Sequence, residues 1–467
     1  MYRAPKPSFL FLALAVFFAC TSSESSSSDS PEDPSSDNLV AYTGLTLIDG
    51  IDPNPKRNYT VVINPDTGDI TDLFEGTQKS LAAHISVRDF SGKYMMPGLI
   101  EGHFHLCSTN GERTQEGLVS MQNMFRQGIT TIRDMFGNGI GVRELQKMGA
   151  PKDQALPKVH FVCLVAGAYF ISIDSRVEAT VGRGTPGEEP WFKVIDDQTD
   201  VGELIQEARS FGCSGLKLYA DISAANAKRL IAKGKEMNFP IFSHGALLEA
   251  GPRDLIGANS LSHADYLNFV TVDELPSLQE FDDPSYVESF PLEDLKSTRM
   301  RDFLTDFKAE NMVLDATLNF YQRRAGPEER HILNFVQAAS KEVYTQGAKI
   351  SAGVDGFNDE ISNPSNFSLL EEIKYLQQQT GMSNFEALQT ATYNNALSLR
   401  IQDEYGSISI GKKADLIVLE ENPLEELEHL RSLELVIKDS HEHKISDENK
   451  VQLRRRTAVT KAFHHCH

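Results

Sequence analysis

The sequence predicts an α/β fold in which a parallel β-sheet is joined to a small β-rich module. Between Pro97 and Arg400, short apolar strand-like runs alternate with amphipathic helix-like stretches, which is typical of βα units. Segments rich in β-forming residues lie on both sides of that region. The chain has 467 residues, 40% of them hydrophobic, which is enough for one large barrel and an accessory module.

The N-terminal segment, residues 1–20, resembles the signal peptide of a bacterial lipoprotein. Basic residues precede an apolar run from Phe9 to Ala19, which is too short to span a bilayer and is typical of a secretory signal. The run ends in Phe17-Phe18-Ala19-Cys20, which is similar to a lipobox although Phe stands where Leu is usual. This similarity implies lipid attachment at Cys20. A signal that is cleaved without acylation is the alternative.

Residues 21–38 follow as an expected tether. They are almost all Ser, Asp, Glu and Pro, so they cannot bury apolar surface, and we predict that they are disordered. The expected protein is therefore exported and held at the bacterial cell envelope, in the periplasm or at the surface, by a lipid anchor.

Composition excludes several other classes of protein. Lys and Arg total 45 against 66 for Asp and Glu, and the formal charge of -21 repels phosphate backbones and anionic lipid surfaces. We expect no nucleic-acid partner, and contact with a membrane only through the anchor. The five cysteines are odd in number and show no Cys-x-x-Cys spacing, so we predict neither a disulfide framework nor a cysteine zinc site.

The β module is predicted from strand-like segments near both ends of the chain. These segments are Tyr42–Ile48, Tyr59–Ile63, Leu416–Leu419 and Leu433–Lys438. We expect residues 39–96 and 401–445 to fold together as a β-sandwich. Residues 446–467, which end in a His-rich stretch, are expected to form a surface tail without a function.

The central region, residues 97–400, supplies the candidate parallel strands. They are Thr130–Arg133, Val159–Val165, Leu216–Leu218, Ile241–His244 and Met312–Leu314. The region is long enough for the eight βα units of a closed barrel, which take about 250 residues. An open doubly wound sheet fits the same alternation, so periodicity alone does not choose between them.

Two histidines give the most specific chemical signal. Pro97 to His105 reads as an apolar strand that presents His103 and His105 two residues apart. Side chains at this spacing share one face of a strand, so both imidazoles can bind one metal ion inside the barrel. The alternative is that the two histidines are only polar residues near a strand end and bind no metal.

A lysine in an apolar run is the next candidate. Lys217 lies within Gly215 to Tyr219, where a buried ammonium is costly unless it is paired or neutralised. A desolvated lysine loses its proton easily, and its free amine can add carbon dioxide. The product is a carbamate, which can bridge two cations as a carboxylate does. A lysine that extends to the strand end is the alternative.

Three more residues close short strand-like runs. His244 and His263 end two successive runs, and Asp355 lies beside two glycines where a carboxylate can approach a metal and its bound water closely. Each alone is typical of a structural histidine or of a turn. Together with the preceding residues they indicate a metal centre.

The ordered set of motifs resembles the amidohydrolase superfamily. It comprises Pro-Gly-Leu-Ile-x-x-His-x-His from Pro97, the lysine, the two single histidines and Gly-x-Asp at Gly353, and residues 386–396 and 406–419 agree with it. The Xaa-Pro and Xaa-Arg dipeptidase and imidazolonepropionase-like branch is the most similar. The resemblance implies a (β/α)8 TIM-like barrel with a small β-sandwich built from both chain ends.

The resemblance also implies a role for each residue. His103, His105 and Asp355 would hold the more buried of two divalent ions, expected to be zinc. His244 and His263 would hold the more exposed ion, and Lys217, carboxylated by carbon dioxide, would bridge the two.

The expected enzyme hydrolyses an amide or dipeptide-like C–N bond of a small molecule. A metal-bridging hydroxide would attack the carbonyl carbon, because metal binding lowers the pKa of water to about 7. Asp355 would pass the proton to the leaving nitrogen. A deaminase or lactonase on the same scaffold is the alternative, and a non-catalytic surface binding protein is a more distant one. The sequence does not identify the substrate, the native metal or the oligomeric state.

Two departures from the family pattern concern the surroundings of the site. Glu101 stands where Asp is usual, which could change how His103 is oriented. Residues 368–372 lack a polar residue that the branch often has near the pocket. Tyr219, and the loop around Arg183 and Trp191, are the expected substrate contacts.

Overall fold

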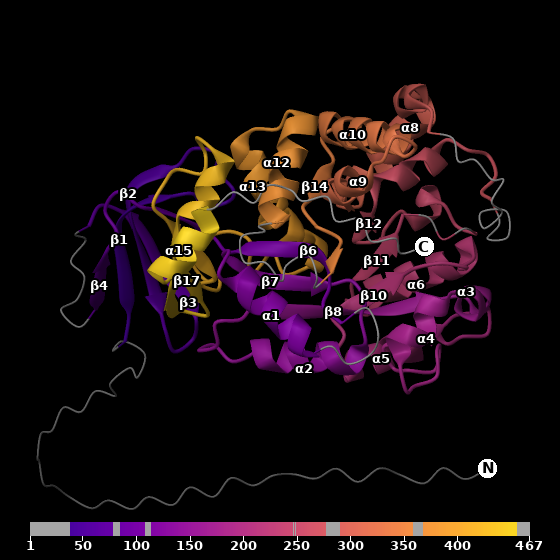
Figure 1. The fold of residues 1–467 in the computed structure, drawn as a ribbon, viewed down its shortest axis with the longest axis horizontal. Coiled ribbons are helices and arrows are strands. Elements are labelled where there is room, and N and C mark those ends of the chain that lie inside the picture. The colour runs from indigo at the N-terminus through magenta and orange to yellow at the C-terminus, as the bar shows by residue number, and fades with distance from the viewer. Residues whose placement is uncertain are drawn as a thin grey trace, which may run out of the picture. The chain divides into compact units, whose positions relative to one another are not determined.

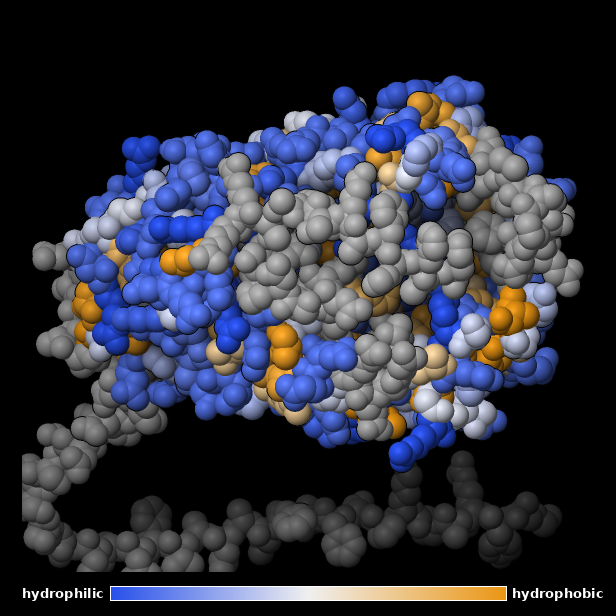
Figure 2. Space-filling view, in the orientation of Figure 1, coloured by the Kyte–Doolittle hydropathy of each residue, from blue (hydrophilic) through white to orange (hydrophobic). Residues whose placement is uncertain are grey.

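The computed structural model describes residues 38–77, 85–107, 114–245, 247, 249–276, 290–357 and 368–454. The predicted signal peptide with Cys20, nearly all of the predicted tether and residues 455–467 lie outside the described residues. Among the helices in the described part of the chain, none has the length and apolar character that a bilayer crossing requires. On the face shown in Figure 2, most described residues are hydrophilic and the hydrophobic ones form small separate groups.

Strands from both ends of the chain form one eight-stranded sheet, in the order β18-β17-β16-β5-β1-β2-β3, with β4 paired to β1. The strands are β1 Val40–Leu47, β2 Lys56–Asn64, β3 Asp69–Glu75, β4 Ser86–Asp89, β5 Tyr94–Pro97, β16 Leu416–Leu419, β17 Leu433–Lys438 and β18 His441–Lys444. The two halves join where β16 pairs antiparallel with β5, Ile417 opposite Met96. All four residues of β16 are buried, which explains its continuous apolar run. The expected module from both ends is confirmed.

The second sheet has ten strands, and its main path runs β14-β13-β12-β11-β10-β8-β7-β6-β15 with β9 beside β8. Its strands are β6 Leu99–His105, β7 Ile129–Asp134, β8 Lys158–Ala166, β9 Phe192–Val194, β10 Gly215–Leu218, β11 Ile241–His244, β12 Ser260–Ser262, β13 Val313–Asp315, β14 Lys349–Ser351 and β15 Gly356–Phe357. All of its paired strands are parallel.

The sheet returns on itself through a single short stretch of chain. β14 pairs with β13, whereas β15, which follows it closely, pairs with β6 at the opposite end of the strand order. Between them, the Gly102 amide donates a hydrogen bond of 3.1 Å to the Ala352 carbonyl. The strands therefore form a curled barrel, and this finding selects the barrel over the open doubly wound sheet.

Helices follow the barrel strands. They are α1 Thr114–Phe125, α2 Gly139–Gly149, α3 Ala168–Ile173, α4 Ser175–Val181, α5 Val201–Phe211, α6 Ala224–Glu236, α8 Thr298–Ala309, α9 Leu318–Arg324, α10 Arg330–Thr345, α12 Ser368–Thr380, α13 Asn384–Thr390, α14 Tyr393–Leu399 and α15 Asp447–Arg454, with 3-10 turns η1 Pro252–Leu255, η2 Ala264–Val270, η3 Leu292–Lys296 and η4 Leu427–Ser432. In Figure 1, α10 and α12 lie on one side of the barrel strands and α1, α2 and α5 on the other.

Local chemistry explains where the helices begin and end, as α5 shows. The Asp200 carboxylate accepts hydrogen bonds from the amides of Gly202 and Glu203, which have no partner inside the helix. The helix ends at Gly212, whose φ of 108° is a left-handed conformation that favours glycine. Strand β10 begins three residues later, so the tight turn sets where Lys217 lies.

Part of the segment expected to be a tail is ordered. Residues 447–454 form α15, in which Leu453 is buried and its carbonyl accepts a hydrogen bond of 3.1 Å from Arg431 of η4. Leu453 is the one buried residue of this helix. The sequence of α15 therefore lacks a repeated apolar pattern and resembles a polar surface segment.

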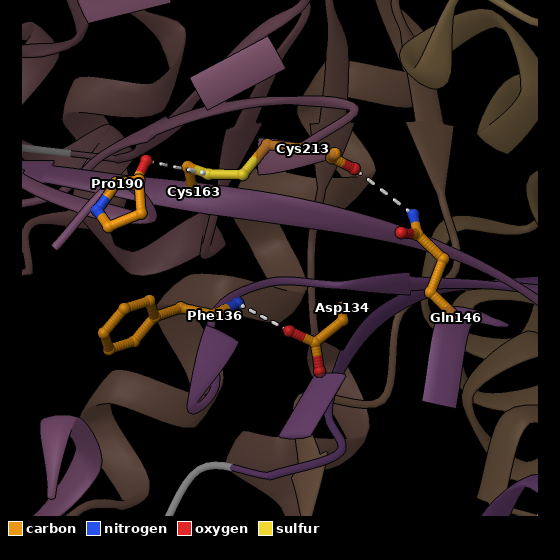
Figure 3. The surroundings of a disulfide bond; sticks show 7 residues. Asp134, Phe136, Gln146, Cys163, Pro190 and Cys213 are labelled. Carbon is orange, nitrogen blue, oxygen red and sulfur yellow. Dashed lines mark hydrogen bonds between the residues drawn. A yellow bond between two sulfur atoms is a disulfide. The ribbon is translucent and has the colours of Figure 1, made fainter. Parts of the chain in front are cut away.

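A disulfide joins Cys163 in β8 to Cys213, just before β10 (Figure 3), which corrects the expectation drawn from the cysteine count. β8 and β10 are adjacent parallel strands, with Val162 paired to Gly215. This adjacency brings together two cysteines 50 residues apart, with 5.8 Å between their Cα atoms. Spacing along the sequence does not reveal such a pair.

Removing this disulfide is expected to destabilise the barrel. The variant carrying Cys163→Ser and Cys213→Ser should lose about 2–4 kcal/mol of unfolding free energy, because the bridge closes a long loop in the unfolded chain. Chemical denaturation with and without a reductant measures the loss. The reductant should lower the stability of the wild type and leave the double variant unchanged. Equal stability of both proteins without reductant would contradict the bridge.

Candidate metal centre

Three predicted ligands meet at the end of strand β6. His103 and His105 lie on this strand, and Asp355 lies between β14 and β15, beside the strand's end. Asp355 Oδ1 is 3.2 Å from His105 Nε2 and 3.4 Å from His103 Nε2. Their ligand atoms lie within 4.8 Å of one another. This cluster can hold one metal ion.

Both imidazoles are oriented by a hydrogen bond at Nδ1. The Nδ1 of His103 lies 2.6 Å from a carboxylate oxygen of Asp315, and that of His105 lies 2.6 Å from the carbonyl oxygen of Phe136. A carbonyl oxygen only accepts, so His105 donates from Nδ1, and its Nε2 faces Asp355. His103 Nε2 is buried and has no hydrogen-bond partner among the described residues. Such an unpartnered nitrogen fits a metal ligand.

Glu101 fixes the backbone that carries these ligands. Its Oε1 accepts hydrogen bonds of 2.9 Å from the amides of His103 and Val354. Burial raises the pKa of Glu101 to about 8. The carboxyl group therefore ties β6 to the segment that carries Asp355, and the imidazole of His103 is oriented by Asp315 instead.

The other two predicted histidines form a second group next to the first. The ring centroids of His244 and His263 are 4.7 Å apart, and those of His263 and His103 are 5.2 Å apart. Burial lowers the pKa of His263 to about 3 and that of His244 well below its usual value. Both imidazoles are therefore neutral at pH 7, which is the form that binds metal.

Lys217 is buried on β10, which lies in the sheet between β6, with His103 and His105, and β11, with His244. Its side chain belongs to β10, next to β11 with His244, and its Nζ donates a hydrogen bond of 3.2 Å to the Met135 carbonyl. Burial lowers its pKa to about 8. A larger fraction of its amine is therefore free at neutral pH than in an exposed lysine, as addition of carbon dioxide requires.

Two of the candidate ligands have a strained backbone conformation. His263 and Asp355 have φ angles of 71° and 48°, in the left-handed region that costs a residue with a side chain about 1–3 kcal/mol. Close packing explains why residue 353 is a glycine. A Cβ atom at Gly353 would lie 2.5 Å from Asp315 Oδ1 and 2.6 Å from His103 Cβ. Strain of this kind clusters at functional sites.

Asp315 and Arg133 complete the site, although the sequence analysis missed them. Asp315 ends β13, one residue beyond the predicted strand, and its Oδ2 is also 3.2 Å from the Arg133 guanidinium and 3.1 Å from the Ser262 hydroxyl. Arg133 is fully buried and also donates to the Gly102 carbonyl. A polar residue at the end of a short apolar strand is the pattern that identified candidate ligands such as His244, and Asp315 at the end of β13 shows the same pattern.

Replacing Asp315 by asparagine is expected to lower metal affinity by about 10- to 100-fold, because the charge that holds the His103 tautomer is lost. Competition with a chromogenic chelator measures the affinity, and thermal unfolding checks that the variant is folded. Asp265→Asn is the matched control, since Asp265 is partly buried and accepts a hydrogen bond from Tyr321 rather than contacting a ligand histidine. Unchanged affinity in folded Asp315→Asn protein would contradict this role.

Of the expected substrate contacts, Tyr219 lies beside the site, with its ring centroid 4.7 Å from that of His244. Trp191 is a correction: it is buried in the core, and a Cβ atom at Gly139 would lie 2.2 Å from its indole. Its size and apolar character favour that packing over exposure. Arg183 is exposed.

The departure at residues 368–372 also has a structural explanation. Glu372 is buried, and its carboxylate accepts hydrogen bonds from the amides of Leu318, at 3.0 Å, and Asn319, at 2.6 Å. These amides begin α9, so Glu372 fixes the helix that follows β13. Burial raises the pKa of Glu372 to about 8.

Comparisons with known proteins agree with this architecture. Residues 287–445 match the model described as Amidohydrolase family. A Xaa-Pro dipeptidase with bound methionine is similar in structure, with a TM-score of 0.65 and 18% identity over 87% of this chain and 100% of that chain. A putative prolidase from Bifidobacterium longum has a TM-score of 0.65 and 20% identity over 89% and 98% of the two chains.

The A. niger ochratoxinase is also similar, with a TM-score of 0.65 and 18% identity over 88% of this chain and 96% of that chain. At these identities the three structures establish the shared fold. A search of the curated proteins found no match.

Proposed function

We propose that the chain is a metal-dependent hydrolase of the amidohydrolase superfamily that cleaves the C–N bond of an amide or dipeptide-like small molecule, because residues 287–445 match the Amidohydrolase family model and the fold is similar to that of a Xaa-Pro dipeptidase. The observation that carries the proposal is the cluster of His103, His105 and Asp355, whose ligand atoms lie within 4.8 Å of one another, with His263 and His244 beside it. The unpartnered His103 Nε2 and the neutral imidazoles of His244 and His263 support metal binding there.

We assign the ligands to two positions. His103, His105 and Asp355 would hold one divalent cation, His244 and His263 a second, and carboxylated Lys217 would be shared between them. Divalent cations such as zinc, when bound there, supply Lewis acidity for the carbonyl and a lowered pKa for water.

Asp355 is the proposed proton carrier. Its burial raises the pKa of the carboxyl group, but the nearby His103, His105 and His263 outweigh this effect and hold the pKa well below its usual value. The carboxylate is therefore ionised, accepts a proton from the attacking water and donates it to the leaving nitrogen. Protonation is needed because an amide anion is a very poor leaving group.

The walls of the site contribute orientation. Asp315 and the Phe136 carbonyl hold the two imidazoles of β6 through Nδ1, and Glu101 accepts hydrogen bonds from the amides of His103 and Val354. These contacts fix both ligands before the substrate binds, so little reorganisation is required during the reaction.

We also propose that the protein is exported and lipid-anchored through Cys20. The disulfide between Cys163 and Cys213 supports an oxidising compartment, since such bonds persist outside the reducing cytosol.

The proposed function is tested by metal removal with matched reagents. Purified protein is assayed on a panel of dipeptides and N-acyl amino acids, then treated with 1,10-phenanthroline or with its non-chelating 1,7-isomer. Chelation is expected to lower turnover at least about 100-fold, and added zinc is expected to restore it. Turnover that persists in protein shown to be metal-free would overturn the proposal. Turnover of lactones or amino-purines alone would indicate the alternative enzyme classes.

A further inference from the structure

Aromatic side chains surround the candidate ligand histidines. Phe357 is stacked on His105, with 5.1 Å between the ring centroids and 15° between the ring planes. The ring centroids of Tyr219 and Tyr266 lie 4.7 and 4.8 Å from that of His244. The ring centroid of Phe320 lies 6.4 Å from that of His263. Three of the four candidate histidines, His105, His244 and His263, therefore lie next to one of these rings. The fourth, His103, is fully buried.

The four rings belong to the end of the barrel that carries the site. Tyr219 follows β10, Tyr266 follows β12 in η2, Phe320 follows β13 in α9, and Phe357 lies in β15. None of them is buried: Phe357 is 37% exposed and the other three are partly exposed. Apolar ring surface therefore remains accessible to a ligand beside the candidate metal ligands.

The position of Phe320 is fixed by contacts at the start of α9. α9 begins directly after Thr317, which has a left-handed φ of 51°, and the buried Glu372 carboxylate accepts hydrogen bonds from the first two helical amides. The Arg324 guanidinium lies 4.7 Å from the centroid of the Phe320 ring. A strained turn and a buried carboxylate thus hold a partly exposed phenyl ring near His263.

An exposed ring at a binding site is stabilised when a ligand covers it. Apolar contact contributes roughly 25 cal/mol for each Å² removed from water, and aromatic pairs add to that value. The four rings themselves carry no charge, so contact with the rings favours an apolar group, whereas a charged group would lose hydration there.

We propose that the substrate is an amide with an aromatic or bulky apolar group next to the scissile bond, such as an N-acylated hydrophobic amino acid. This inference rests on the proposed hydrolase function and adds its substrate class. Phe320 and Phe357 are the residues that determine this specificity, because their side chains offer no polar group.

Two matched pairs of substrates test the proposal. N-acetyl-L-phenylalanine is compared with N-acetyl-L-alanine, and N-phenylacetylglycine with N-acetylglycine, so that the ring is placed on either side of the amide. In at least one pair, kcat/KM is expected to be about 100-fold higher for the aromatic member. Phe320→Ala or Phe357→Ala is expected to reduce this ratio to about 10-fold or less.

Phe90→Ala is the control, since Phe90 is a partly exposed ring in the β module, 5.9 Å from Tyr42, and its loss is expected to leave the ratio unchanged. Titration calorimetry on metal-loaded Asp355→Asn protein separates this inference from the proposed function. Tighter binding of the aromatic members, without turnover by the wild type, would support the inference and contradict the function. Equal kcat/KM and equal binding within both pairs would overturn the inference even if hydrolysis is observed.

Discussion

Replacement of Asp355 by asparagine is expected to lower kcat by about 10²- to 10⁴-fold, the range found when a positioned acid–base group is removed. Asparagine has nearly the same shape and keeps an oxygen that can lie near His103 and His105. It cannot accept a proton from water or donate one to the leaving nitrogen. Turnover of a dipeptide or N-acyl amino acid, measured on protein of known metal content, gives the effect.

The metal content of Asp355→Asn protein is expected to fall much less than its turnover, because the remaining ligands are retained. Asp254→Asn is a matched control, since this partly exposed carboxylate is paired with Lys228 away from the site. Wild-type turnover in metal-loaded Asp355→Asn protein would show that another group carries the proton.

Replacement of Lys217 by alanine is expected to lower kcat/KM by at least about 100-fold, since even partners of metal ligands contribute 10- to 100-fold. The variant loses the carbamate that is proposed to connect the two metal positions. It also leaves space in β10 that a short carboxylate such as acetate can enter. Added acetate is therefore expected to restore part of the activity, which an assay across acetate concentrations measures.

Lys217→Arg is the matched variant for this experiment. A guanidinium keeps the positive charge but cannot add carbon dioxide to form a carbamate. It is expected to be as inactive as the alanine variant and not to respond to acetate. Full activity of Lys217→Arg would mean that Lys217 is a structural cation.

The sequence predicted the candidate ligands because each one lies in an apolar strand or shortly after one. His103 and His105 alternate with Phe104, and all of β6 except its last residue is buried, so the side-chain period of a strand brings both imidazoles to one face. His244 ends β11 in the same way. In a parallel barrel the carboxyl ends of the strands meet, so residues with this position in sequence become neighbours in space.

Contacts between distant strands were not predictable from these local patterns. His103 and Asp315 are 212 residues apart, and their contact depends on how β6 and β13 lie across the barrel interior. Arg133 was assigned to a strand but not to the site, because a buried arginine is recognisable only from its partners Asp315 and Ser398. The disulfide was missed for the same reason: it depends on which strands are adjacent.

The burial of residues in loops and at the surface was also not predictable from the sequence. Trp191 lies in a polar stretch, yet the tight approach of Gly139 places the indole in the core. Helix α15 has one buried leucine and therefore lacks the apolar period that identifies a helix in sequence.

The central claim is a centre for two cations connected by carboxylated Lys217, and elemental analysis tests it most directly. Wild-type protein and Lys217→Ala protein, both checked for folding, are loaded with zinc, dialysed and measured for zinc per chain. We predict about two ions in the wild type, and one or fewer together with the loss of turnover in the variant. A single ion in the wild type that is retained, with activity, in Lys217→Ala protein would contradict the account.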